Sequence, residues 1–397
     1  MSYILKEVTS SVDKKLFIDF PKKLYSENKF WVCPLDSDIE NVFSPIKNKK
    51  FEGGEAVRWI VLDRKNTVVG RIAAFYNQQQ ASIEKQPTGG CGFFESIDSQ
   101  EVANMLFDAA KDWLGQKGME AMDGPINFGN RDSWWGLLVD GFEKTPLYAN
   151  SYNFPYYQKL FEAFGWRNYF NQYTYLREIK SGLLSSSVYD KVKRLENDSN
   201  YTFRHIEKSD YHRVAEDVRT IYNKAWARFS GVNPLSKEQA DELFASLRLI
   251  IDPKLIYFAY YDDEPIAFFI NIPDLNRIIG KFGGRLNFVN KLRLLWCLRR
   301  KKSDRIFGMT FGVVPQFQGK GVESGLICCM EKEIDKGSFR SYKSMELAWI
   351  GDFNPVMMRM VESYVGAVRH KMHTTYRYFF DSDKPFERCP RLGVLKG

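Results

Sequence analysis

The chain has 397 residues, of which 44% are apolar and 15% aromatic, so it can bury a large core and disorder is not the expected state. Lys and Arg outnumber Asp and Glu by 57 to 49, and the net charge of +8 favours anionic partners without requiring nucleic acid. The sequence has no signal-peptide pattern and no apolar run of about 18 residues, so we expect a cytoplasmic protein without a transmembrane segment. It also has no CxxC pair, so we expect its cysteines to be reduced thiols.

The first half of the chain carries the elements of a mixed sheet with helices. Residues 56–63 and 67–76 are apolar runs around a turn and predict a hairpin, and residues 91–96 predict another strand. Helices are expected over 99–118, which starts at a serine and ends at a glycine, and over 153–166.

The second half shows its elements more clearly. Periodicity and turn residues predict strands, helices and a hairpin whose turn is "DDEP". This order implies a mostly antiparallel sheet with one parallel pair around a glycine turn. The predicted elements are a strand at 201–206, helices at 211–229 and 237–251, a hairpin at 254–272, a strand at 305–315, a helix at 323–335, a strand at 344–351, a helix after Asn354 and a strand at 373–380.

Two pairs of segments repeat about 200 residues apart in the same order. Residues 153–166 match 354–367, each with Asn followed twelve residues later by Gly, and 66–77 resemble 263–274. The repeat favours a duplicated domain over two unrelated α/β units. The polar, serine-bearing stretch 181–200 is the expected join.

The segment "FGVVPQFQGKGVESGL" (311–326) predicts a buried strand, a sharp turn and a helix start. Amides at a helix start lack intrahelical partners and carry partial positive charge. The turn is therefore a candidate site for a phosphate or pyrophosphate.

This segment resembles the signature of the GCN5-related N-acetyltransferase (GNAT) superfamily, which uses acyl thioesters of coenzyme A. The resemblance covers about 201–380 and, more faintly, about 10–180. It implies two tandem α/β (α+β) GNAT-like domains, each a mixed, mostly antiparallel sheet flanked by helices. Their expected ranges are 1–180, with an aromatic insertion at 127–157, and 201–397, with a basic insertion at 277–302.

By this resemblance, the loop amides hold the coenzyme's pyrophosphate, strand amides reach its pantetheine arm, and an asparagine begins the next helix beside that arm. The expected co-substrate is acetyl-CoA or another acyl-CoA, and the acceptor is a small-molecule or peptide amine. The corresponding residues are Val313, Val314, Gln318, Gly319, Lys320, Gly321, Val322 and Asn354.

Several residues depart from the family pattern. Glu323 stands where a small residue is usual, and the place of the usual tyrosine acid holds Glu362, with Tyr364 rotated about 200° away on a helix. The strand before the glycine turn has no carboxylate base, so Glu346 or Asp352 is expected to act through water. The catalytic candidates are therefore Glu346, Asp352 and Glu362, with no general acid assigned.

The first half lacks the glycine turn, because Ser96, Asp98 and Ser99 occupy the place of a phosphate loop. Asp98 would repel a phosphate, so we expect no coenzyme there. The Trp and Tyr residues of 127–157 either line an acceptor pocket or close a core beneath a long loop. His370 and His373 have no further ligands near them in sequence, and no metal is expected.

The basic segment 286–302 allows an acidic substrate, a membrane surface or nucleic acid, and a helix docked on the body with a solvated basic end is favoured over all three. The sequence therefore predicts an acyl-CoA-dependent N-acyltransferase that transfers an acetyl group to a primary amine. A non-catalytic binding protein and an aminoacyl-tRNA-dependent transferase of the tandem type remain as alternatives.

Overall fold

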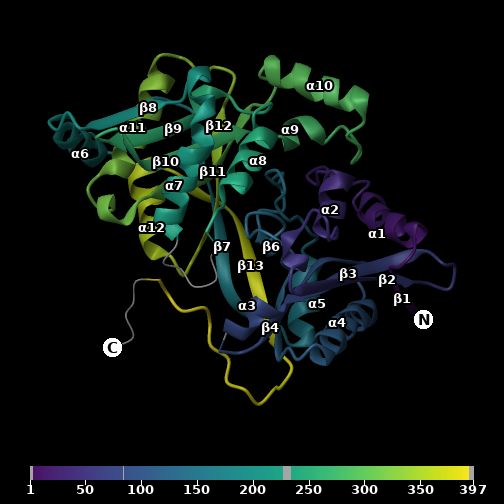
Figure 1. Ribbon diagram of the computed structural model, residues 1–397. Coiled ribbons are helices and arrows are strands. Elements are labelled where there is room, and N and C mark those ends of the chain that lie inside the picture. The colour runs from purple at the N-terminus through teal and green to yellow at the C-terminus, as the bar shows by residue number, and fades with distance from the viewer. Residues whose placement is uncertain (1–2, 84, 227–233, 393–397) are drawn as a thin grey trace.

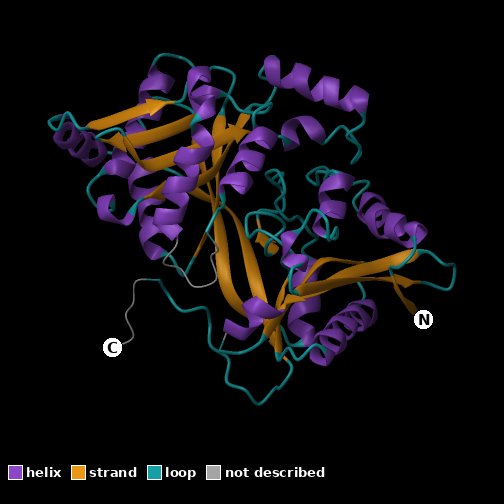
Figure 2. Ribbon diagram, viewed as in Figure 1, coloured by secondary structure: helices purple, strands orange, loops and turns teal. Residues whose placement is uncertain are grey.

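The computed structural model describes residues 3–83, 85–226 and 234–392. Within these ranges, a single 13-stranded sheet runs through the molecule, and helices cover both faces of it (Figures 1 and 2). The strand order is β1-β2-β3-β4-β5-β13-β7-β12-β11-β10-β9-β8, and β6 pairs with β13. The α/β fold predicted from the sequence is confirmed.

The strands are mostly antiparallel, and the two parallel pairs are β4 with β5 and β11 with β12. Both pairs occur where a helix connects the strands, as a parallel connection requires. The strands are β1 (Ile4–Glu7), β2 (Gly54–Leu62), β3 (Val68–Asn77), β4 (Thr88–Ser96), β5 (Ala121–Gly124), β6 (Leu137–Asp140), β7 (Arg167–Glu178), β8 (Tyr201–His205), β9 (Ile256–Tyr261), β10 (Glu264–Pro273), β11 (Arg305–Val313), β12 (Ser344–Gly351) and β13 (Val368–Phe379).

Short local signals fixed several elements. The turn between β9 and β10 places Asp262 and Asp263 at φ of 49° and 62°, the left-handed pair that a two-residue hairpin requires.

The helices are α1 (Ser11–Leu24), α2 (Asp36–Val42), α3 (Gln78–Ile83), α4 (Gln100–Gln116), α5 (Tyr156–Phe164), α6 (Ser186–Glu196), α7 (Val214–Trp226), α8 (Lys237–Leu247), α9 (Asn276–Ile279), α10 (Phe288–Arg299), α11 (Val322–Asp335) and α12 (Pro355–Met360).

Four short 3₁₀ helices and one short π-helix, η5, complete the described elements. The five are η1 (Lys49–Phe51), η2 (Lys208–His212), η3 (Pro253–Leu255), η4 (Pro315–Phe317) and η5 (Val361–Val365). The helix predicted over 211–229 is present as η2 and α7, and residues 227–229 of that prediction lie outside the described residues.

The two halves of the chain exchange their last strands. β7, from the first half, pairs with β12 of the second half, and β13, from the second half, pairs with β5 of the first. β7 and β13 also pair with each other along most of their length, at the centre of the shared sheet (Figure 1). The predicted domain ranges 1–180 and 201–397 stay a prediction, because one continuous sheet gives no gap at which to divide them.

Two hydrophobic clusters form the main cores, one for each half. The first gathers around α4 and α5, with Phe107 and Phe161 fully buried. The second gathers beneath α11, with Val322 and Leu326 fully buried. The expected join at 181–200 contains α6, whose buried Val188 belongs to the second cluster.

No helix within the described ranges is long and apolar enough to cross a bilayer.

Candidate functional site

The parallel strands β11 and β12 pair at their first residues and then separate. The ladder joins Arg305–Gly308 to Ser344–Leu347 and stops there, although β11 continues to Val313 and β12 to Gly351. A bulge opposite Ile270 and Asn271 bends β11 at the same point. Beyond Gly308, the facing backbone edges of the two strands are not joined in the ladder.

The glycine turn lies at the end of this separated strand, with Gln318, Gly319 and Lys320 exposed and Gly321 buried. Gly319 and Gly321 have φ of 74° and 93°, a region that residues with a Cβ rarely adopt. Gly321 is the N-cap of α11, and no side chain of the described residues caps this helix start. Buried Val322 anchors the first turn in the core, so the helix-start amides are held in place.

The backbone groups at the end of β11 point to two different edges of the strand, one toward β10 and one toward the gap beside β12. The Val314 amide donates to the Ile266 carbonyl over 2.9 Å, so it is engaged in the sheet. Alternation along a strand puts the Val313 amide on the opposite edge, toward β12. The Gln318 side chain donates to the Val313 carbonyl over 3.0 Å, which braces the turn against its own strand.

A lysine that sequence reasoning missed lies beside the turn. A Cβ added at Gly321 would be 3.3 Å from the Cβ of Lys191, which belongs to α6. The ammonium of Lys191 lies 3.9 Å from the centroid of the Tyr364 ring. The aliphatic part of Lys191 therefore packs beside the uncapped helix start, and exposed Lys320 lies in the turn itself.

Asn354 is found where the resemblance implied, at the start of the helix after β12. It is the N-cap of α12, and its side chain accepts a hydrogen bond of 3.2 Å from the Met357 amide. The turn, the separated strands and this helix start surround one end of the parallel pair. That these residues hold a coenzyme stays a prediction.

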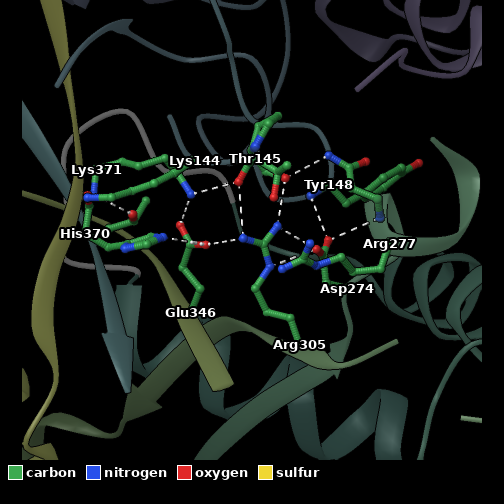
Figure 3. Close-up of polar contacts among 12 residues, drawn as sticks. Lys144, Thr145, Tyr148, Asp274, Arg277, Arg305, Glu346, His370 and Lys371 are labelled. Atoms are coloured by element: carbon green, nitrogen blue, oxygen red, sulfur yellow. Dashed lines mark hydrogen bonds and ion pairs between the residues drawn. The ribbon is translucent and has the colours of Figure 1, made fainter. Parts of the chain in front are cut away.

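Glu346 belongs to a different place, a buried network where the halves meet (Figure 3). Its carboxylate has no exposed surface and pairs with Lys371 of β13 and, over 2.8 Å, with Arg305 of β11. Arg305 also donates to Asp274 over 2.7 Å. Backbone carbonyls of Thr145 and Pro146, from the first-half insertion, accept from Lys371 and Arg305.

The charges of this network balance within the protein. Burial alone would raise the pKa of Glu346, but Lys371 and Arg305 outweigh it and hold that pKa below its usual value. Burial lowers the pKa of His370, which lies 3.9 Å from Glu346, to about 4. Near neutral pH, Glu346 is therefore an ionised carboxylate held by two cations, and His370 is uncharged.

The other two candidate carboxylates lie nearer the surface, and each pairs with an arginine. Asp352 follows β12 and accepts from Arg388 over 2.6 Å. Glu362 lies in η5, where it accepts from Arg369 over 2.9 Å and from the Tyr175 hydroxyl over 3.1 Å. The structure therefore does not bring Glu346, Asp352 and Glu362 together into one cluster, and their catalytic roles stay a prediction.

The first half has its own cavity, of about 80 Å³, beside the separating strands β4 and β5. Trp134, Tyr148 and Tyr152 of the aromatic insertion line it, whereas Tyr157 is buried in the core. Some aromatic residues of the insertion therefore line a cavity and others close the core, and the role of the cavity as an acceptor pocket stays a prediction. The cavity floor carries a second group that sequence reasoning missed, in which Glu95 accepts from the hydroxyls of Tyr25 and Tyr157.

His370 and His373 lie on strand β13. The His373 ring bonds through Nε2 to the Ser151 carbonyl over 3.1 Å, which requires a proton on that nitrogen. Within the described ranges, no group of three or more His, Cys, Asp and Glu side chains is placed to hold a metal ion.

Comparison with known proteins identifies the architecture. A tandem GNAT protein from the clavulanic acid biosynthesis pathway superposes with a TM-score of 0.54, covering 96% of this chain and 100% of that one, at 9% identity. The chain has the tandem GNAT fold. The resemblance drawn from the glycine turn is thereby confirmed.

Two further solved structures support this tandem GNAT fold. A GCN5-related N-acetyltransferase from Sphaerobacter thermophilus gives a TM-score of 0.50 at 10% identity, covering 98% of each chain. The glucosamine N-acetyltransferase region of a fungal multi-domain GH3 beta-N-acetylglucosaminidase gives 0.55 at 10% identity; it covers 95% of this chain and 38% of the fungal one. Identities this low establish the fold alone.

Sequence comparison finds relatives that extend along nearly the whole chain. Bacterial ceramide synthase of Caulobacter vibrioides is 28% identical over 377 residues, which is 93% of this chain and 95% of that protein. Protein YghO of Escherichia coli is 25% identical over 371 residues, 92% of each chain. No protein-family model matches the chain.

Proposed function

We propose that this protein is an acyl-CoA-dependent N-acyltransferase whose coenzyme site is in the second half. The observation that carries the proposal is the helix start at Gly321, which no side chain of the described residues caps and which follows the exposed turn residues Gln318–Lys320, at the end of two strands that have separated. Unpartnered amides and a helix dipole favour a pyrophosphate at this point. Lys320 in the turn and Lys191, whose side chain packs on Gly321, add positive charge near it.

The gap between β11 and β12 offers a place for the rest of the coenzyme. The pantetheine arm would lie along the open edge of β11, with the Val313 amide as a donor, and Asn354 would lie near it. The Val314 amide, which donates to Ile266, is not part of this proposal. Gln318 would act indirectly, by holding the turn against Val313.

The reaction is direct attack of an acceptor amine on the thioester carbonyl. A carbon–nitrogen bond forms, the carbon–sulfur bond breaks, and the proton lost by the amine balances the proton that the coenzyme A thiolate takes up. Another backbone amide on the open edge of β11 would stabilise the oxyanion of the tetrahedral intermediate. The protein's main contribution is alignment of the two substrates.

The proton route favours the carboxylates that solvent can reach. Asp352 and Glu362 have side-chain exposures of 24% and 35%, and either could accept the amine proton through water. Glu346 is enclosed and held by two cations, so we assign it a role in joining the two halves instead of direct proton transfer.

For the acceptor, we propose a long-chain amine and an acyl group longer than acetyl. The basis is the 28% identity to bacterial ceramide synthase along nearly the whole of both chains. A ceramide is the amide of a fatty acid and a long-chain amino alcohol, so forming it from a thioester is the reaction described above. This choice replaces the acetyl group favoured by the sequence pattern alone.

A matched pair of glycine variants tests the coenzyme site. Gly319 and Gly118 are both exposed, have φ of 74° and 79°, and would place a Cβ where nothing lies within 4 Å. Gly319→Val and Gly118→Val therefore carry a similar backbone strain, but only the first crowds the turn. Calorimetric titration with palmitoyl-CoA should show at least a tenfold loss of affinity for Gly319→Val and little change for Gly118→Val.

Product formation is tested separately, by mass spectrometry after incubation with palmitoyl-CoA and sphinganine. An amide product that is lost in Gly319→Val supports the proposal. Equal coenzyme affinity in the two glycine variants, or binding of charged transfer RNA with no binding of any acyl-CoA, would overturn it.

A further inference from the structure

The segment that contains α9 and α10 concentrates the positive charge of the protein. Residues 275–303 include nine Lys or Arg and no Asp or Glu, a surplus larger than the net charge of +8 for the whole chain. α10 lies at the outer edge of the molecule, away from the central strands (Figure 1). No residue of α10 is fully buried.

One side of α10 holds it against the body. Leu294, Cys297 and Leu298 pack on the cluster formed by α9, the loop after it and Leu35. The chain around α10 is fixed at both ends, by the Asn287 side chain, which accepts from the Asn290 amide, and by the Lys301 pair with Asp252. The orientation of the helix is therefore set, and its other side faces outward.

That outward side is apolar. Phe288, Leu292 and Trp296 recur at intervals of four and are 74%, 53% and 54% exposed, and Val289 beside them is 69% exposed. Residues at this spacing form one stripe along a helix. A stripe of large side chains, two of them aromatic, is not needed to dock α10, because the opposite side already does so.

Basic side chains border the stripe. By helix geometry, Lys291 lies on one side of it, Arg293 and Arg300 on the other, and Arg299 near its end. All four are exposed, and none forms an ion pair with a carboxylate in the part of the chain that the structure describes. The surface thus presents an apolar stripe flanked by positive charges.

The chemistry of this surface selects among anionic partners. A nucleic acid backbone would pair with the lysines and arginines but would leave Phe288, Val289 and Leu292 in water. Single-stranded bases could cover the Phe288 ring by stacking on it. A bilayer that contains anionic phospholipids satisfies both features, since headgroup phosphates meet the basic residues and acyl chains cover the stripe. Twelve residues span about 18 Å, so the helix would lie in the surface plane and not across the membrane.

We propose that α10 docks the protein on the surface of a membrane containing anionic phospholipids, with Phe288, Leu292 and Trp296 inserted at the boundary between headgroups and acyl chains. The inference rests on this surface and is independent of the proposed acyl transfer. If both hold, the helix would keep the enzyme at the membrane in which a long-chain amine is dissolved.

Co-sedimentation with vesicles tests the docking. One probe is vesicles of phosphatidylglycerol and phosphatidylcholine at a molar ratio of three to seven, and the other is vesicles of phosphatidylcholine alone. Neither acyl-CoA nor an amine is present. The full chain should partition at least tenfold more strongly onto the anionic vesicles. Combined Phe288→Gln, Leu292→Gln and Trp296→Gln should lower that binding at least tenfold, and Arg299→Glu with Arg300→Glu should remove its preference for anionic lipid.

A matched control replaces three other exposed apolar residues, Val12, Ile46 and Leu249, by Gln. It should bind vesicles as the unchanged chain does. Vesicle binding that is absent, or equal in the α10 variant and the control, overturns the proposal. So does light scattering that shows the stripe to be buried between two copies of the chain, or binding to single-stranded RNA without binding to vesicles.

Discussion

The two halves of the molecule make the same connection from a strand to a helix in opposite ways. In the first half, β4 leads into α4, whose start is capped by the Ser99 side chain, and the Ser96 amide donates to the Tyr157 hydroxyl over 3.0 Å. In the second half, β11 leads through two glycines to the uncapped start of α11. One half caps its helix start with a side chain, and the other has no side-chain cap within the described residues.

The difference shows that a shared fold does not place the same chemistry in both copies. Both parallel pairs separate after a few residues, with β4 and β5 joined over Thr88–Gly90 and Ala121–Asp123. In the first half, an aromatic-lined cavity lies beside the gap, whereas the second half has a basic, exposed turn at its end. The halves also differ in their buried glutamates, and this provides the strongest test.

Removing the charge of Glu346 should destabilise the protein far more than removing that of Glu95. Glu346→Gln leaves Lys371 and Arg305 buried without a full counter-charge, which costs about 3–5 kcal/mol. Glu95 accepts from two tyrosine hydroxyls, with Arg71 3.6 Å away, and burial raises its pKa. Glu95→Gln keeps an acceptor for both hydroxyls, so its cost should be about 1–2 kcal/mol.

Urea unfolding of the two glutamate variants measures the difference. Adding Lys371→Met to Glu346→Gln removes one stranded cation and should recover part of the lost free energy of unfolding. A similar cost for both glutamates would mean that the network does not depend on charge balance.

The strand exchanged into the first half carries a second, pH-dependent contribution. Burial lowers the pKa of His373 to about 4, whereas an unfolded histidine titrates near 6.5. Between these values the unfolded chain binds the proton and the folded chain does not, so stability falls as the pH drops from about 6.5 to 4. The loss at pH 4 is about 3 kcal/mol.

His373→Gln retains a donor for the Ser151 carbonyl and cannot be protonated in this range. The free energy of unfolding of this variant should therefore fall less steeply between pH 6.5 and 4 than that of the unchanged chain. His212→Gln, at an exposed position, serves as the control. Parallel pH profiles for all three proteins would contradict the assignment.

Local signals predicted the elements well, and long-range contacts set the rest. The hairpin at Asp262 and Asp263, the glycine turn and the helix start at Asn354 each depend on a few consecutive residues, and each was found as predicted. The strand exchange was not predicted. Hydrophobic alternation shows that β7 and β13 are strands but carries no information about which half supplies the neighbour.

Long-range contacts also explain why some site residues were not predicted from the sequence. Lys191 reaches Gly321 across 130 positions of sequence, from a segment whose polar composition suggested only a join. Lys371 meets Glu346 because β13 crosses to the centre of the shared sheet. The composition of α10 did indicate a basic surface, but only its docking on one side revealed that the other side is an apolar stripe.

Lysines beside the turn should contribute modestly to coenzyme affinity in the second half. Lys191→Ala removes a half-buried charge next to the helix start, and a loss of about fivefold for palmitoyl-CoA is expected, since one such interaction contributes about 1 kcal/mol. Lys193→Ala, two residues along the same helix at an exposed position, is the matched control and should change the affinity little. If both variants lose the same affinity for palmitoyl-CoA, the lysines act through general electrostatic attraction and not as part of a binding site.

The smallest effect is expected on the free energy of unfolding, when the side-chain cap of α4 in the first half is removed. Ser99→Ala removes a cap whose hydrogen bond to the Val102 amide is long, at 3.4 Å, so the free energy of unfolding should fall by about 0.5–1 kcal/mol. Palmitoyl-CoA affinity should be unchanged, because the proposed coenzyme site is in the second half. A drop of more than threefold would place the coenzyme in the first half and reverse the contrast between the two connections.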